Sequence, residues 1–247
     1  MVEISYLCRL KMANEYFQFK QFTVRQQHCA MKVGTDGTLL GAWAQASAGP
    51  CRVLDVGTGT GLIALMMAQR YPEAQVTAID IDEKAVFQAR ENVMASPFAD
   101  RIMVYEADVQ AFDDAEKFDS IVCNPPFFED SLVCPDPQRT EARHTVSLGY
   151  RQLMEAAFRL LKDDGHFSVI IPADCRSRLE SEAHLRGFFI SRLCSVQTTP
   201  SKAPKRYMIE FSKHTVNEID TTNGILESYP QVRSEWYRKL TQEFYIK

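Results

Sequence analysis

The sequence predicts an α/β fold in which a mostly parallel sheet of seven strands carries helices on both of its faces. Two observations lead to this prediction. Short apolar segments rich in β-branched residues alternate along the chain with longer segments whose apolar residues recur at helical spacing. The first clear strand, residues 53–56, also runs through three closely spaced glycines into an apolar helix at 62–68, which is a strand–loop–helix unit typical of such sheets.

The predicted elements follow in order along the chain. The strands are residues 53–56, 75–80, 101–108, 118–123, 166–171, 188–197 and 207–212, with the last one antiparallel. The helices are residues 62–68, 82–95, 150–161 and 176–185. A strand or hairpin at 17–24 and a helix at 38–46 precede this core, with a turn bracketed by Gly34 and Gly37. An amphipathic helix at 234–245 closes the chain and packs on the core.

No Pro-, Gly- or Ser-rich linker divides the 247 residues, so we expect a single domain. Within it, residues from about 15 to 46 form an N-terminal segment. Residues from about 51 to 213 form the sheet core, and residues 214–247 form a C-terminal tail with its helix.

The glycine spacing after the first strand suits a cationic cofactor better than a dinucleotide. Gly57, Gly59 and Gly61 permit a tight turn and a close approach of the backbone to a ligand. Their G-x-G-x-G spacing differs from the G-x-G-x-x-G of dinucleotide-binding loops. Asp55 beside the loop would repel a pyrophosphate and attract a cationic amino-acid group. Glycines also end strands for purely steric reasons, and the loop alone leaves that interpretation open.

Two further strands end in carboxylates. Asp80 lies 19 residues after Gly61, where an acid that accepts from both ribose hydroxyls is expected. Asp80 could instead cap the following helix, but Asp82 fills that role more naturally. Asp108 could accept from an adenine amino group, and a helix cap before residues 109–112 is nearly as good an interpretation.

The strand at 118–123 ends in Asn124-Pro-Pro-Phe127. With the glycine loop and the two terminal acids, this order of elements resembles the class I S-adenosylmethionine-dependent methyltransferases. Their amino-methylating members hold a planar nitrogen, such as adenine N6, guanine N2 or a glutamine amide, with a similar motif. The resemblance implies a Rossmann-like core and S-adenosyl-L-methionine as the cofactor, and we expect no metal.

The residue types of this motif suit methyl transfer to an exocyclic amine, whose lone pair is delocalised into its ring. The Asn124 side-chain oxygen and the Pro125 carbonyl can accept the two amine hydrogens, which aims the lone pair at the methyl group. Pro125 and Pro126 fix these acceptors in advance, and Phe127 offers a face for stacking. No general base is needed before transfer, because the amine is neutral. The target nucleotide must leave its stack, which favours a single-stranded or loop substrate.

Further segments narrow the resemblance. Residues 17–44, the Asn124 motif and Gln138-Arg-Thr-Glu-Ala-Arg-His144 resemble the bacterial tRNA1(Val) adenine-N6 methyltransferase family. That resemblance implies methylation of adenine 37, beside the anticodon, and an N-terminal segment that closes over the cofactor. Lys32 and Thr35 are then candidates to touch the methionine end of the cofactor. The full set of candidate cofactor-binding residues is Lys32, Thr35, Asp55, Gly57, Thr58, Gly59, Gly61, Asp80, Ile81, Asp108, Val109 and Asn124.

The overall charge is not that of a typical RNA-binding protein, since the formal net charge is −4 and the pI is near 5.8. Phosphate contacts depend on local charge, because salt screens each charge within about 8–10 Å. The candidate RNA-binding residues are Lys20, Arg25, Arg139, Arg143, Lys202, Lys205 and Arg206. An ordinary solvated surface charge is an equally good interpretation for each group. His144 is interpreted as a structural histidine.

The cysteine pattern indicates the cellular compartment in which the protein works. The chain has seven cysteines and no C-x-x-C pair, so free thiols in a reducing cytoplasm fit better than disulfides or zinc. No signal segment or apolar run of membrane length is present in the sequence. We therefore expect a cytoplasmic monomer that binds tRNA and no membrane. Met12 is a possible alternative start.

Three alternatives to adenine-N6 methylation stay open. A guanine-N2 methyltransferase acting on ribosomal RNA would carry nearly the same loop. Protein glutamine methyltransferases use a similar loop but carry a helical N-terminal domain, whereas the 52 residues before Val53 look strand-like. A non-catalytic module that binds the cofactor is opposed by the presence of Asp55, Asp80 and Asn124.

Overall fold

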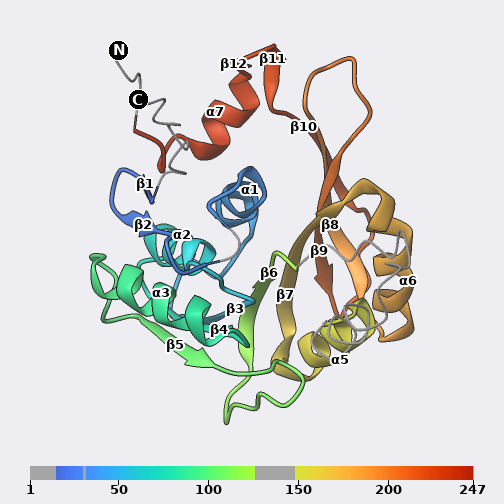
Figure 1. Ribbon diagram of the computed structural model, residues 1–247. Helices are drawn as coiled ribbons and strands as arrows, with labels where there is room; N and C mark the ends of the chain where they lie inside the picture. The colour runs from blue at the N-terminus through green and yellow to red at the C-terminus, as the bar shows by residue number, and fades with distance from the viewer. Residues whose placement is uncertain (1–14, 30–31, 126–147, 247) are drawn as a thin grey trace, which may run out of the picture.

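The computed structural model describes residues 15–29, 32–125 and 148–246 of the chain. Its centre is an eight-stranded sheet of order β10-β8-β9-β7-β6-β3-β4-β5 (Figure 1). The strands are β3 (Cys51–Val56), β4 (Ala74–Asp80), β5 (Ile102–Glu106), β6 (Phe118–Cys123), β7 (Leu161–Pro172), β8 (Phe189–Gln197), β9 (Arg206–Ser212) and β10 (Asp220–Ile225). Strands β3 to β7 are parallel, and β9 is antiparallel to both of its neighbours. The predicted α/β fold is confirmed.

All seven predicted strands are present, and β10 adds an eighth at the edge beside β8. The sequence of β10, Asp-Thr-Thr-Asn-Gly-Ile, has no alternation of apolar and polar residues. Its first four residues are exposed, so nothing selects apolar side chains there. For that reason the hydrophobic pattern did not reveal this strand.

Helices cover both faces of the sheet. One face carries α1 (Thr35–Trp43), α2 (Leu62–Arg70), α3 (Glu83–Met94) and α7 (Glu235–Thr241) (Figure 1). The other face carries α5 (Tyr150–Leu160) and α6 (Arg176–Leu185). A short 3-10 turn at Ala173–Cys175 leads into α6. The central strands are buried on both sides: Val53 faces the first group of helices, and Leu54 faces the second.

Helix α1 begins at Thr35, three residues before the predicted start of 38–46. Gly34 is the extended N-cap residue, and Asp36 in the first turn favours the helix because it faces the positive end of the helix dipole. A Cβ at Gly37 would lie 3.1 Å from Leu62 of α2. The glycine therefore serves close helix packing and does not form the predicted turn.

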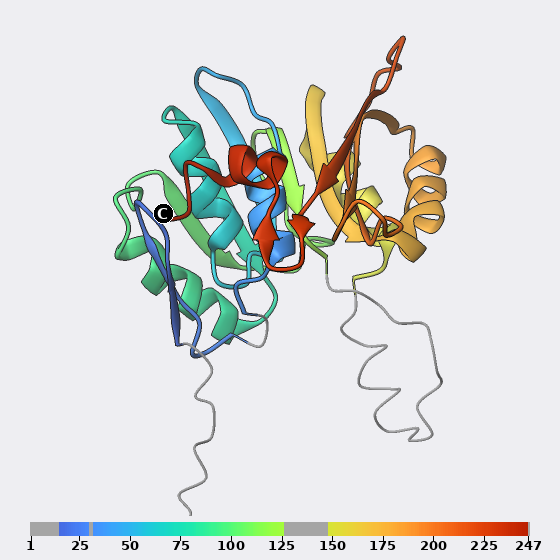
Figure 2. The ribbon, with the colours of Figure 1, turned by 90° about the horizontal axis from the view of Figure 1, so that it is seen from above.

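The two ends of the described chain lie together. Strands β1 (Tyr16–Gln18) and β2 (Thr23–Arg25) form the predicted hairpin. The amide of Lys20 in the hairpin loop donates to the carbonyl of Phe244 at 2.8 Å, and the Phe19 and Tyr245 rings stack with centroids 5.7 Å apart. Figure 2 shows the tail crossing over α1 before it reaches the hairpin.

The tail contains more than the predicted helix. Strands β10, β11 (Glu227–Tyr229) and β12 (Val232–Arg233) precede α7, which ends at Thr241 and not at 245. Ser234 caps α7 by accepting from the Tyr237 amide at 3.0 Å. Phe244 is buried, and Trp236 and Leu240 pack against the same core, so the expected packing role of this segment is confirmed.

Cys29, Cys51, Cys123, Cys175 and Cys194 are all free thiols. Within the described residues, no helix is both long enough and apolar enough to span a bilayer.

Candidate active site

The site lies at the carboxyl edge of the parallel strands, where the strand order reverses between β3 and β6. Strands β4 and β5 extend the sheet to one side of β3, and β6 and β7 extend it to the other. Ligands of open α/β sheets bind in the crevice at such a point. A cavity of about 630 Å³ opens here, lined by the loops that follow β3, β4, β5 and β6 and by the start of α1.

The glycine loop after β3 forms the floor of this cavity. Gly57, Gly59 and Gly61 all have positive φ angles, of 69°, 56° and 80°, which side chains rarely tolerate. Apart from the adjoining residues of the loop, no heavy atom of the described residues lies within 4 Å of where a Cβ of Gly57 or Gly59 would stand. The backbone of the loop therefore faces open space that a ligand can enter. Thr58 also lines the cavity, whereas Gly61 is the left-handed N-cap residue of α2 and packs against Ala89.

Asp80 ends β4, lines the cavity and is fixed in place by two backbone amides. Its Oδ2 accepts from the Gly59 amide at 2.8 Å, and its Oδ1 accepts from the Asp82 amide at 3.0 Å. Each carboxylate oxygen keeps further acceptor capacity for a ligand hydroxyl. Asp82 caps α3 by accepting from the Lys84 amide at 2.9 Å, so the cap belongs to Asp82 and not to Asp80, as predicted.

Asp55 lies beneath the glycine loop and is fully buried. Its Oδ2 accepts from the Thr58 hydroxyl at 2.6 Å and from the Ala64 amide at 3.1 Å. Burial raises the pKa of Asp55 to about 7, although these two hydrogen bonds act to lower it. Asp55 therefore holds the loop to α2, and it is not among the residues that line the cavity.

Asp108 lies after β5 and also lines the cavity. Its Oδ1 accepts from the Gln110 amide at 2.9 Å, and its carbonyl closes a turn with the Ala111 and Phe112 amides. No helix follows Asp108, since residues 109–111 form a turn, so the helix-cap interpretation is wrong, whereas Asp108 does face the cavity. Ile81, which is about half exposed, and buried Val109 line the cavity beside the two aspartates.

The N-terminal segment forms the opposite wall. Lys32 and Thr35 line the cavity, as does Asp36 in the first turn of α1. Asp36 Oδ2 accepts from Arg206 Nε at 2.8 Å. This ion pair joins the N-terminal segment to the start of β9 across 170 residues of sequence. No sequence signal predicted it, and Asp36 was missed as a residue of the site.

Asn124 follows β6 directly and lines the cavity. Its side-chain oxygen Oδ1 is buried, yet no hydrogen-bond donor reaches it from the described part of the chain. Buried acceptors are rarely left without a donor, so this oxygen is available for a ligand. Pro125 is buried next to it. Pro126 and Phe127 lie outside the described residues, as do Arg139, Arg143 and His144.

The remaining candidate RNA-binding residues are dispersed. Lys20 Nζ donates to the Gln242 carbonyl at 2.5 Å and so ties the hairpin to the tail. Arg25 lies on β2, whose backbone is held by the Asn92 side chain. Lys202 and Lys205 are exposed on the loop between β8 and β9, and Arg206 pairs with Asp36. Only the last three lie at the edge of the sheet that carries the cavity.

Other residues of the cavity were also missed. Cys29, Gln110 and Leu148 contribute to its lining. Burial raises the pKa of the Cys29 thiol to about 11, with Asp80 and Asp82 adding to the effect, so this thiol stays protonated. No group of three or more His, Cys, Asp or Glu side chains that could hold a metal ion occurs in residues 15–29, 32–125 and 148–246.

Comparisons with known proteins agree with this arrangement. Residues 36–192 match the model of the methyltransferase small domain family. The chain is 48% identical over 239 residues to the tRNA1(Val) (adenine(37)-N6)-methyltransferase of Bacteroides thetaiotaomicron, covering 95% of this chain and 99% of the relative. It is 49% identical over 235 residues to the protein of the same name from Phocaeicola vulgatus, with the same coverage of both chains.

Solved structures show the same fold at low sequence identity. The crystal structure of a predicted O-methyltransferase from Agrobacterium tumefaciens has a TM-score of 0.66 at 20% identity and covers 85% of this chain and 96% of its own. A glycopeptide N-methyltransferase in complex with S-adenosyl-L-methionine has a TM-score of 0.55 at 14% identity, covering 74% of this chain and 90% of its own. At these identities the likeness concerns the fold alone.

Proposed function

The chain belongs to the family of tRNA1(Val) (adenine(37)-N6)-methyltransferases, and from this premise we propose that it methylates the exocyclic N6 of adenine 37 in tRNA1(Val). It is a methyltransferase that uses S-adenosyl-L-methionine. The substrate, one adenine of one tRNA, is the part that we propose.

One observation carries the proposal. Asn124 Oδ1 is a buried acceptor that lacks a donor among the described residues, and it stands at the wall of the cavity. An exocyclic amine brings the donors that such an oxygen needs, whereas a hydroxyl or thiolate acceptor of a methyl group brings one hydrogen or none. The Pro125 carbonyl is proposed to accept the second amine hydrogen.

The cavity fits the cofactor. S-adenosyl-L-methionine supplies a methyl group made electrophilic by a positively charged sulfur. Asp80, held by two amides with acceptor capacity left, is proposed to bind the ribose hydroxyls. Asp108 is proposed to accept from the adenine amino group, with Ile81 and Val109 packing on the ring faces. The open backbone of Gly57 and Gly59 leaves room for the amino-acid part.

The chain's own residues then do three things in the reaction. The cavity walls hold the cofactor on one side of Asn124. Asn124 and Pro125 fix the two amine hydrogens, so the nitrogen lone pair points out of the base plane toward the methyl group. No side chain needs to remove a proton first, because the neutral amine loses one after transfer.

We also propose the organisation that surrounds this chemistry. The N-terminal segment, about residues 15–46, is proposed to cover the cofactor through Lys32 and Thr35. Pro126 and Phe127 are proposed to complete the base pocket. Lys202 and Lys205 are proposed to contact RNA, as are Arg139 and Arg143. The protein is proposed to act as a monomer in the cytoplasm.

The test is methyl transfer from labelled cofactor to total tRNA that lacks the modification, followed by nucleoside mass spectrometry and mapping of the labelled tRNA. The proposal expects N6-methyladenosine at position 37 of one valine tRNA. N2-methylguanosine, or label in ribosomal RNA or protein with none in tRNA, would overturn the substrate and leave the methyltransferase assignment in place.

A further inference from the structure

The charges at the carboxyl edge of the sheet are divided between two sides. The cofactor side consists of the segments that follow β3, β4 and β5, and it presents Asp80, Asp82 and Asp108 to the cavity. The substrate side consists of the segments that follow β6 and β7 and the loop that precedes β9. Within it, residues 173–180 and 198–205 carry four cations outside the cavity, namely Arg176, Arg178, Lys202 and Lys205.

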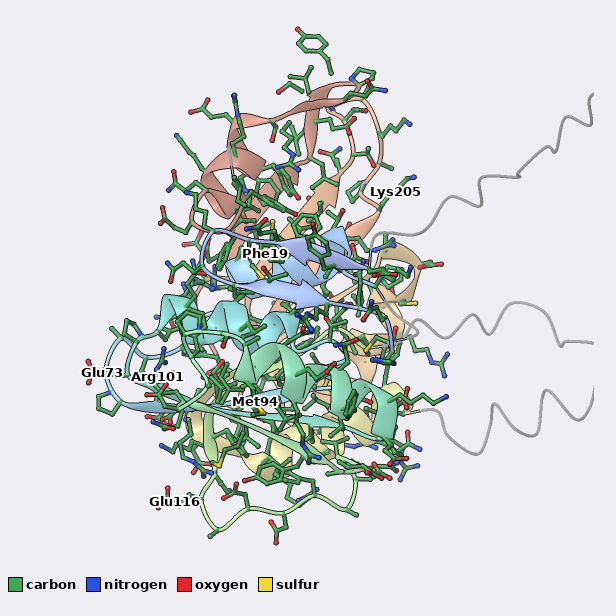
Figure 3. The ribbon with its side chains drawn as sticks, turned by 60° about the vertical axis from the view of Figure 1, so that its left-hand side comes forward. Phe19, Glu73, Met94, Arg101, Glu116 and Lys205 are labelled. Atoms are coloured by element: carbon green, nitrogen blue, oxygen red, sulfur yellow. The ribbon has the colours of Figure 1, made fainter. Side chains whose placement is uncertain are left out.

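Backbone contacts bring the two cation-bearing segments together. Strand β9 is antiparallel to β7 and pairs its first residue, Arg206, with Pro172 at the end of β7. The loop carrying Lys202 and Lys205 therefore lies at the carboxyl edge, and the Lys205 carbonyl accepts from the Ala173 amide at 3.1 Å. Ala173 begins the turn that leads directly into α6. Figure 3 shows Lys205 far from Glu116, which precedes β6 at the opposite edge of the sheet.

Aromatic rings support both arginines of α6. The guanidinium carbon of Arg176 lies 4.5 Å from the centroid of the Tyr207 ring, and that of Arg178 lies 5.8 Å from the centroid of Tyr150. A guanidinium held over an aromatic face loses less freedom when it binds an anion. Guanidinium groups also match the geometry of phosphate oxygens.

Residues 173–180 and 198–205 together carry these four cations and two carboxylates, Asp174 and Glu180, so their formal charge stays positive. Glu180 pairs with Arg176 at 2.6 Å, and Asp174 is exposed in the turn before α6. Lys202 and Lys205 are exposed on their loop, and Arg178 is exposed on α6. An RNA strand that approaches the site is therefore attracted to the substrate side and repelled from the cofactor side.

We propose that the first turn of α6 and the β8–β9 loop form one phosphate-binding surface for the RNA strand, with Arg176, Arg178, Lys202 and Lys205 as its contacts. The surface holds the backbone next to the target nucleotide while the base enters beside Asn124. This inference rests on the proposed function, and it adds two arginines that the sequence patterns did not indicate. It also gives the RNA a direction of approach, over β7 and β9 and away from β4 and β5.

The test compares two double variants in their binding of the tRNA substrate over a range of salt concentrations. Arg178→Gln/Lys205→Gln removes one cation from each segment. Lys84→Gln/Lys117→Gln is the matched control, with Lys84 at the start of α3 on the cofactor side and Lys117 before β6 at the opposite edge. Each phosphate contact contributes about 0.7 to 0.9 to the slope of log affinity against log salt. We expect the first variant to lose about 1.5 from that slope.

Steady-state kinetics at one salt concentration complete the test. We expect Arg178→Gln/Lys205→Gln to raise the KM for tRNA about tenfold or more, with kcat and the cofactor Kd within about twofold. The control should keep the wild-type KM and slope. The proposed surface is wrong if the salt dependence of tRNA binding weakens equally in the two double variants, or if it weakens only in the control.

Two safeguards keep the result interpretable. If Arg178→Gln/Lys205→Gln does not fold, Lys202→Gln/Lys205→Gln, which changes only exposed loop side chains, replaces it with the same expectations. Failure of the proposed function has a different signature, because wild-type protein would then transfer no methyl group to tRNA. Wild-type activity on tRNA together with an unchanged slope in the variants overturns this inference alone.

Discussion

The polar groups that line the cavity differ between the cofactor side and the substrate side in whether they are already bonded. On the cofactor side, Asp80 accepts from two backbone amides and Asp108 from one. Below the cavity, Asp55 anchors the glycine loop through Oδ2, while its buried Oδ1 has no donor among the described residues. On the substrate side, Asn124 Oδ1 is buried without a donor from the described residues. The fold therefore orders the carboxylates of the proposed cofactor pocket before any ligand is present, and it leaves the proposed base-binding acceptor to be completed by the substrate.

The sharpest test of this difference is Asn124→Ala. Because its oxygen contributes to the positioning of the amine and not to the fold, we expect kcat to fall by about 100- to 1,000-fold or more. The cofactor Kd should stay within about twofold. Single-turnover methyl transfer and calorimetry measure the two quantities. Asn223→Ala, on the exposed edge strand β10, is the control and should keep the wild-type rate. A wild-type rate of methyl transfer in Asn124→Ala would contradict the proposed mechanism.

The next largest effect concerns the pH dependence of stability, through Asp55. Burial raises its pKa from the ordinary value of 3.8 to about 7 in the folded protein, so the folded state binds this proton more tightly than the unfolded state does. Its contribution to the free energy of unfolding is complete below about pH 4 and is lost as the pH rises through about 7. Asp55→Asn should remove this dependence, which amounts to at most about 4 kcal/mol. Urea unfolding of the wild-type protein and the variant between pH 4 and 8 measures this pH dependence. If the free energy of unfolding changed equally with pH in both proteins, Asp55 would be ionised throughout.

A smaller effect is expected for Asp80→Ala. The substitution removes the acceptor for the Gly59 and Asp82 amides as well as the proposed ribose contact. We expect the cofactor Kd to rise about 10- to 100-fold, equivalent to about 1.5–3 kcal/mol, with kcat at saturating cofactor nearly unchanged. Asp164→Ala, an exposed position near the start of β7, is the control. A fall in kcat without a change in Kd would contradict the separation of the two sides.

The smallest effect should come from the ion pair that links the two sides. Asp36 and Arg206 have side chains 21% and 32% exposed, so solvent screens their attraction. A double-mutant cycle with Asp36→Asn and Arg206→Gln should give a coupling of about 0.5–1 kcal/mol in cofactor binding. The charge swap Asp36→Arg/Arg206→Asp should recover part of the loss. Strict additivity of the single effects would show that the pair does not position α1.

Most residues that line the cavity on the cofactor side could be predicted from the sequence, because their signals are local. Glycines within five residues and acids at strand ends are read directly from the sequence, and the residues that follow one another there also meet in space. The Asp36–Arg206 pair and the contact between Ala173 and Lys205 join segments that are distant in the chain. No periodicity reveals such contacts, and for the same reason the arginines of α6 were not connected with the lysines of the β8–β9 loop.

The contact between the hairpin and the tail has a consequence for synthesis of the protein. The Lys20 side chain bonds to Gln242, 222 residues later in the chain, and the Phe19 ring stacks on Tyr245. A ribosome adds about 5–20 residues per second, so roughly 10 to 45 seconds pass before the hairpin can meet its partner. Until then, the Phe19 ring lacks its contact with Tyr245. In the nascent chain, this side of the hairpin therefore stays without its packing partner until residues 242–245 have left the ribosome.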